Sequence, residues 1–197
     1  MDRREALKTT SLLLGFSMSA TAVAAVMQGC TSEATHMAED EWRPLYFEQD
    51  DMGLIEELCE TIFPKTATPG AKDALVHQYV DLMMKEHYQL RDQQEFVRGL
   101  QLVRDKSRAD FGKEFMDLAP DQKTSLLETM EADTSQLWAN GEFTLAERPF
   151  FMTLKELTYI GYFTSEIVGE HHLAYDPIPG QYDGCTPLAD IGNTWSL

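Results

Sequence analysis

Apolar side chains recur at helical spacing through most of this chain, and prolines separate the runs. The first run ends before a proline and consists of Leu54, Ile55, Leu58 and Ile62. Residues spaced three or four apart lie on one face of an amphipathic helix. No segment shows the strict apolar–polar alternation between hairpin turns that indicates strands. The sequence therefore predicts an all-α protein.

The periodicity predicts about five helices packed into a single compact domain over residues 50–197. Their approximate ranges are 51–63, 71–88, 92–117, a segment starting at Pro120, and 149–170. Pro69 and Gly70 mark a loop between the first two, and Pro120 suits the first position of a helix. The polar stretch "RDKSRAD" is a candidate bend within the third helix. An irregular tail rich in proline, glycine and tyrosine completes the domain.

The N-terminus has the features of an export signal. Arg3 and Arg4 precede a weakly apolar run from about Thr9 to Met27, which contains many small and hydroxylated residues. Residues 1–29 are therefore predicted to be a signal peptide of the twin-arginine type, which directs folded cargo. The alternative is a permanent membrane-spanning helix, because the run is about long enough to cross a bilayer.

Cys30 follows the apolar run directly after a small residue, as in a lipoprotein cleavage site. Met27 and Gln28 depart from the usual lipoprotein pattern, so cleavage of an ordinary signal nearby remains the alternative. With lipid on Cys30, residues 30–49 become a lipidated tether or arm. The protein is then expected in the periplasm or cell envelope, anchored to a membrane.

The charge of the chain limits its partners. The formal net charge is −17, and it becomes −18 without residues 1–29, which carry three basic and two acidic side chains. Nucleic acid and anionic lipid both repel such a protein. Any membrane attachment is therefore expected to come from Cys30.

Two cysteines, Cys59 and Cys185, lie beyond the signal. An exported protein can keep a disulfide, and one pair allows only one connectivity. The alternative is a buried Cys59 that packs as a small apolar residue, with Cys185 separate from it.

Motifs for cofactor or catalytic chemistry are missing from the sequence. It contains no GxGxxG, no CxxCH and no GxSxG, and too few cysteines for an iron–sulfur cluster. His171 and His172 are adjacent, so they point in different directions on a helix and suit its C-terminal end better than a metal. The chain is thus predicted to have no catalytic, cofactor-binding or metal-binding residues of its own.

Aromatic and proline residues gather near the C-terminus. Rigid aromatic segments provide large contact areas at low entropic cost. A partner interface is therefore predicted at Tyr159, Tyr162, Tyr175, Pro177, Pro179 and Tyr182. The alternative is that the tail only wraps its own helices.

Three segments resemble the gluconate 2-dehydrogenase subunit 3 family: "ETIFPKTATPGAKDALVHQYVDLMM", "FFMTLKELTYIGYFTSE" and "YDPIPGQYDGC". The most specific parts are the Thr-Pro-Gly-Ala turn at residues 68–71 and the Pro-x-Pro-Gly-x-Tyr-x-Gly-Cys element at residues 177–185. The similarity extends over about residues 50–190.

The resemblance implies a small, non-catalytic subunit of an oxidoreductase complex. Such subunits accompany a large FAD-dependent dehydrogenase of the glucose-methanol-choline type, often with a cytochrome c subunit, and FAD is then expected in the partner. The small subunit would carry the export signal for both, and Cys30 would make it an anchor as well. Nothing in the chain selects a particular sugar or sugar acid. A stand-alone envelope lipoprotein or binding module without a dehydrogenase is the competing interpretation.

Overall fold

The structure is a computed structural model that describes residues 42–144, 148–175, 178, 180–181 and 184–195. The chain divides into two units, Met1–Arg43 and Pro44–Leu197, and every helix described below belongs to the second. Several residues with predicted roles lie outside the described part: Arg3, Arg4, Cys30, Pro177, Pro179 and Tyr182.

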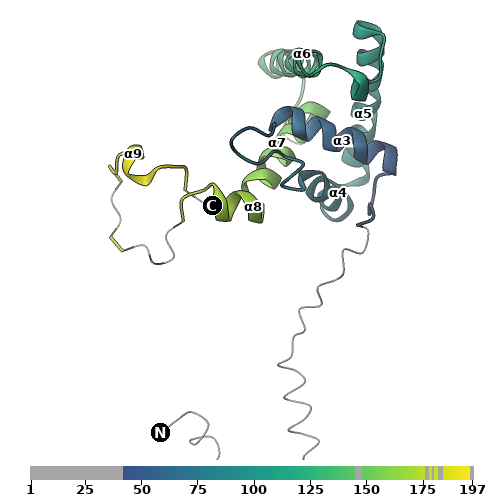
Figure 1. Ribbon diagram of the computed structural model, residues 1–197. Coiled ribbons are helices and arrows are strands. Elements are labelled where there is room, and N and C mark those ends of the chain that lie inside the picture. The colour runs from purple at the N-terminus through teal and green to yellow at the C-terminus, as the bar shows by residue number, and fades with distance from the viewer. Residues whose placement is uncertain (1–41, 145–147, 176–177, 179, 182–183, 196–197) are drawn as a thin grey trace, which may run out of the picture. The chain divides into compact units, whose positions relative to one another are not determined.

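The prediction of an all-α protein is confirmed (Figure 1). The described residues form no strand, and their only extended pairing is an isolated bridge between Ala174 and Trp195. In chain order the elements are α3 (Gln49–Ile62), α4 (Val76–Glu86), α5 (Leu90–Phe111), the 3-10 turn η1 (Phe115–Asp117), α6 (Pro120–Ala139), α7 (Phe150–Phe163), α8 (Glu166–His171) and α9 (Leu188–Ile191).

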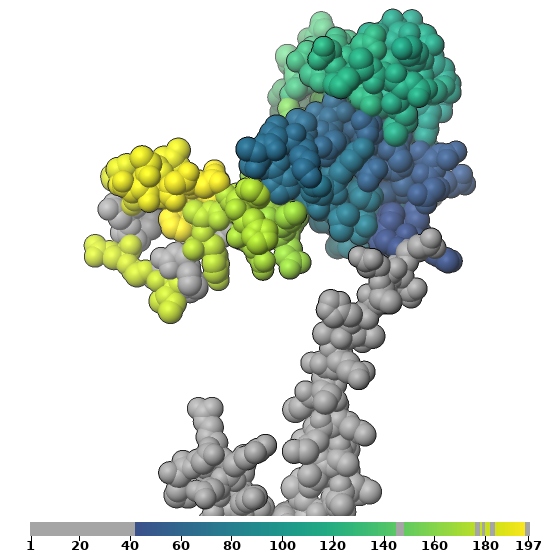
Figure 2. Space-filling model, in the orientation of Figure 1, coloured from purple at the N-terminus to yellow at the C-terminus, as the bar shows by residue number. Residues whose placement is uncertain are grey.

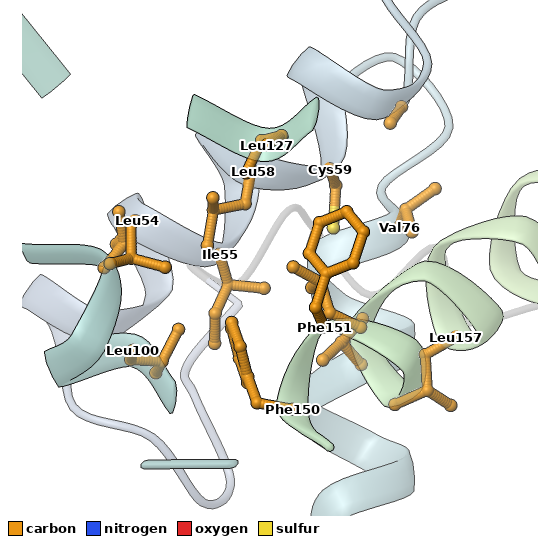
Figure 3. Packing of buried hydrophobic residues seen from close by; sticks show 14 of the residues in the cluster. Leu54, Ile55, Leu58, Cys59, Val76, Leu100, Leu127, Phe150, Phe151 and Leu157 are labelled. Atoms are coloured by element: carbon orange, nitrogen blue, oxygen red, sulfur yellow. The ribbon is translucent and has the colours of Figure 1, made fainter. Parts of the chain in front are cut away.

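Helix α7 organises the core, because it contacts α3, α4, α5 and α6. The buried residues of α7 include Phe150, Phe151, Leu154 and Leu157. Figure 3 shows the rings of Phe150 and Phe151 reaching from the start of α7 towards Ile55 and Cys59 of α3. Phe150 also lies against Gly99 of α5, where a side chain would overlap its ring.

The third helix ends six residues before its predicted boundary at residue 117. Gly112 adopts a left-handed conformation, with φ 68°, and its N–H donates to the carbonyl oxygen of Arg108. A glycine in this conformation is a common helix terminator. The "RDKSRAD" stretch remains helical, and Phe115 and Leu118 enter the core from the turn that follows.

The last predicted helix divides into α7 and α8 at Thr164 and Ser165. Ser165 has an extended backbone, and its hydroxyl donates to the carbonyl oxygen of Tyr162 at 2.7 Å. Serine favours such local bonds over continued helix, which explains the break.

The segment before α3 is fixed to the body by a buried carboxylate. Asp81 of α4 is fully buried and accepts backbone N–H bonds from Leu45, Tyr46 and Phe47, at 2.6, 3.1 and 3.0 Å. The Phe47 ring is buried against Phe96, with centroids 5.5 Å apart. The compact unit therefore includes this arm and starts at Pro44, six residues before the domain boundary expected from the sequence.

Candidate interaction surface

The loop of residues 63–75 is fastened to α3 and α7. The two carboxylate oxygens of Glu60 accept the backbone N–H groups of Lys65 and Lys72, each at 2.9 Å. From α7, the Tyr162 hydroxyl donates to the carbonyl oxygen of Pro69 at 2.8 Å. These bonds fix the loop at three points, so its backbone is a rigid part of the surface.

The Thr-Pro-Gly-Ala turn at residues 68–71 owes its small residues to this packing. A side chain at Gly70 would overlap the carboxylate of Glu60. Ala71 is buried, and its N–H donates to the carbonyl oxygen of Phe63 at 2.9 Å. The motif is therefore needed to close the loop against α3.

Helix α4 starts five residues after the predicted position, at Val76, because the loop bonds hold residues 71–75 in turns. Leu75, directly before the helix, has φ 52° and ψ 33°. It is the one non-glycine residue with positive φ in the described part of the chain. Left-handed backbone is costly for a residue with a β-carbon.

A pair of lysines connects the loop and α6 to Glu57 of α3. The ammonium groups of Lys72 and Lys123 lie 2.5 and 2.7 Å from the two oxygens of its carboxylate. Burial alone would raise the pKa of Glu57, but the hydrogen bonds from Lys123 and Lys72 outweigh it and hold the pKa below its ordinary value. The carboxylate is thus stabilised in its charged form as a link between three segments.

An aromatic cluster lies where α3 and α7 end. The rings of Phe63 and Tyr162 are stacked, with centroids 4.5 Å apart and planes 3° from parallel, and Phe163 and Tyr159 pack beside them. Tyr159 is exposed, as an interface residue should be. Tyr162, also predicted at the interface, is only 6% exposed, and its hydroxyl holds the loop.

A groove with a volume of about 370 Å³ separates the loop from α8. One wall consists of Asp73, Ala74 and Leu75, and the other consists of residues from Ser165 to His171. In Figure 2 the yellow-green surface of α8 adjoins the blue surface of this loop.

The C-terminal segment returns to the residues that follow α8. The Ala174 N–H donates to the carbonyl oxygen of Thr194 at 2.7 Å, and the Asn193 side chain donates to the carbonyl oxygen of His172. We call the part of the chain from Ala174 to Trp195 the closed segment. Its helix α9 contributes no buried residue. Four large apolar or aromatic side chains of this closed segment are exposed: Tyr175, Ile178, Leu188 and Trp195.

The model of one protein family, described as gluconate 2-dehydrogenase subunit 3, matches residues 49–180, about two thirds of the chain. The chain belongs to this family. It is accordingly an accessory subunit of an oxidoreductase complex of the gluconate 2-dehydrogenase type. No curated protein and no solved structure matches the chain.

The matched region relates the family to particular parts of the structure. It starts at the first residue of α3 and includes the loop, the aromatic cluster and both walls of the groove. It ends at residue 180, so Leu188 and Trp195 of the closed segment lie beyond it. Tyr182 and Cys185 also lie beyond it, although they belong to the C-terminal segment whose sequence resembles the family.

The disulfide considered for this subunit 3 protein is not formed in the structure. Cys59 is a free thiol in the core, 3.3 Å from the hydroxyl oxygen of Thr158, whereas Cys185 is exposed. Burial raises the pKa of the Cys59 thiol to about 12, so this residue behaves as a small apolar side chain.

In the part of the chain that the structure describes, no group of three or more histidine, cysteine, aspartate or glutamate side chains is placed to hold a metal ion. His171 ends α8 and His172 follows it, as expected for residues near a helix C-terminus. None of the helices in that part of the chain is long and apolar enough to cross a membrane.

Sequence reasoning missed the residues that hold the N-terminal arm and the loop in the subunit 3 chain. Asp81 follows Val80 and lies four residues after His77 on the buried face of α4, and an acidic residue on such a face is a recognisable signal of internal bonding. Glu60 and Leu75 carry no comparable signal, because their roles depend on the loop conformation.

Proposed function

We propose that this subunit escorts a large FAD-dependent dehydrogenase of the glucose-methanol-choline type through twin-arginine export and then holds it at a membrane. The closed C-terminal segment supplies part of the contact. FAD belongs to the large subunit, which oxidises a sugar or sugar acid, and a cytochrome c subunit takes the electrons. Membership of the subunit 3 family supports association with such a complex.

The observation that carries the contact proposal is the exposure of the closed segment. Tyr175 is 73% exposed and Leu188 is 68% exposed, and α9 buries nothing. Large apolar side chains grouped on a surface mark sites of protein association. If the closed segment only stabilised the fold, these side chains would be buried against the helices of the same chain.

Export and anchoring rest on the sequence. Arg3 and Arg4 before a weakly apolar run support the twin-arginine route, and Cys30 at its end supports lipid attachment. A diacylglycerol and an N-acyl chain together provide stable anchoring. Changing both arginines to lysine should leave this chain and its flavoprotein in the cytoplasm, and the intact mass of the mature chain should show the acyl groups on Cys30.

A matched pair of leucines tests the contact. Leu188 in α9 and Leu90 at the start of α5 are 68% and 67% exposed, so their exchange for serine removes equal apolar surface. We expect Leu188→Ser to reduce recovery of the flavoprotein with the full-length chain, at an unchanged melting temperature. Leu90→Ser should leave both unchanged.

Three outcomes would contradict the proposal. Equal recovery of the flavoprotein with both variants would remove the closed segment from the contact. Purification of the native chain without any flavin-containing polypeptide would favour a stand-alone envelope lipoprotein. Flavin absorption by the small subunit alone would refute the assignment of FAD to the partner.

A further inference from the structure

The groove between the loop and α8 presents an apolar side chain at an unfavourable backbone position. Leu75 lines the groove, is 52% exposed and has φ 52°. The other described residues with positive φ are three glycines: Gly112, Gly141 and Gly192. Glycine would fit position 75 without strain, so leucine there gains little for the fold of the isolated chain.

The loop bonds explain how this conformation persists. Lys72 is held by Glu60, and the Leu75 N–H donates to the carbonyl oxygen of Lys72 at 3.0 Å. Strained residues cluster where proteins bind ligands, held in place by the surrounding structure. The strain and the exposed apolar side chain coincide at a concave surface, which points to an occupant from outside this unit.

The opposite wall is acidic. Glu166 and Glu170 of α8 are both exposed and both line the groove, and neither forms an ion pair within the described part of the chain. Asp73 on the loop wall is already paired with Lys65 at 3.0 Å. Ile167 of α8 adds apolar surface between the two glutamates.

We propose that this groove receives an apolar side chain of the large dehydrogenase subunit, flanked there by lysine or arginine. The apolar group packs on Leu75 and Ile167, and the cations pair with Glu166 and Glu170. A net charge of −17 on the small subunit steers a basic segment towards it. This inference rests on the proposed function, since it names the chemistry of the same partner.

Leu75→Gly separates binding from folding. Glycine accepts the left-handed conformation, so the melting temperature should stay the same or rise. The affinity should fall about tenfold, which corresponds to about 1.4 kcal/mol, because the apolar contact is removed. Leu82→Ala is the control, since Leu82 is an exposed leucine of α4 outside the groove, and it should not change the affinity.

A second pair of variants tests the electrostatic contribution of the acidic wall to binding. Glu166→Gln with Glu170→Gln should weaken binding at low salt and reduce the salt dependence of the dissociation constant. Glu86→Gln with Glu128→Gln changes the net charge equally at exposed positions outside the groove, so it should have a smaller effect.

The assay uses the full-length chain in detergent and the flavoprotein recovered with it, released in high salt and rebound at several salt concentrations. An unchanged dissociation constant for Leu75→Gly would overturn the inference, as would equal losses for the groove and control variants. A self-associating small subunit whose dimer is lost in Leu75→Gly would also overturn it, because the occupant would then be a second copy.

The binding results distinguish an error in the groove inference from an error in the proposed function. If the native chain binds the flavoprotein and Leu188→Ser weakens binding while Leu75→Gly does not, only the groove is wrong. If the native chain does not bind the flavoprotein, both proposals fall.

Discussion

Replacing Asp81 with asparagine tests the bond between the N-terminal arm and the helical body. The native carboxylate accepts three backbone N–H groups while fully buried, two on Oδ1 and one on Oδ2. Asparagine has almost the same shape but only one acceptor oxygen. Its amide would face the Leu45 N–H, so that two donors would meet at this partly buried bond.

The expected cost follows from these bonds. A hydrogen bond to a charged group contributes about 1.5–3 kcal/mol, and a neutral one about 1 kcal/mol. Losing the bond from Leu45 and weakening those from Tyr46 and Phe47 should together lower the free energy of unfolding by about 3 kcal/mol. For a chain of this size, this corresponds to a fall in melting temperature of about 6–12 °C.

Denaturant unfolding and limited proteolysis measure two parts of this effect. Unfolding gives the loss for the whole domain. Chymotrypsin cleavage after Tyr46 and Phe47 reports release of the arm, since Phe47 is buried in the native chain. Asp110→Asn, at an exposed position in α5, is the control for the change in charge.

The interpretation of Asp81 would be refuted by an Asp81→Asn variant that unfolds within about 0.5 kcal/mol of the control, the range of ordinary surface substitutions. Faster cleavage of the arm without any loss in global stability would show that the arm is a separate folding unit. In that case Asp81 holds the arm but does not support the core.

Three further predictions concern the scaffold. Gly99→Ala should destabilise the domain by about 1–3 kcal/mol because the added methyl group overlaps the buried ring of Phe150. Gly53→Ala, with open space around it in α3, should instead stabilise the domain by about 0.5–1 kcal/mol. Thermal unfolding measures both effects. Tyr162→Phe removes one hydrogen bond and should lower the melting temperature by about 2–4 °C. The lowered pKa of Glu57 predicts stability that is present above about pH 4.3 and lost as the pH falls through the folded-state pKa, and Glu57→Gln should abolish this part of an acid titration.

The sequence predicted the helices well where one face is continuous and apolar. In α3 the structure buries Leu54, Ile55 and Leu58 of the predicted stripe, because burial of an amphipathic face is what stabilises such a helix. Gly112 was a readable stop signal, since glycine commonly ends a helix in the left-handed conformation.

The loop of residues 63–75 could not be predicted in the same way. Its conformation depends on Glu60, which is close in sequence, and on Tyr162 of α7, which lies 93 residues from Pro69. Tyr162 therefore looked like an interface residue by composition, although its hydroxyl and ring are both used within the core. Periodicity describes which face of a helix is buried, but it cannot identify the tertiary partner of a polar atom.

The same bonds determine what the proposed contact surface can do. Glu60 and Tyr162 fix the loop wall of the groove, and Ser165 fixes the start of the opposite wall. A partner that binds between fixed walls orders few additional groups of this subunit, so little affinity is lost to conformational entropy. Removal of Leu75 should then act mainly by speeding dissociation, whereas neutralising Glu166 and Glu170 should also slow association, because long-range attraction acts before contact. Rate measurements on the two variants can distinguish these contributions.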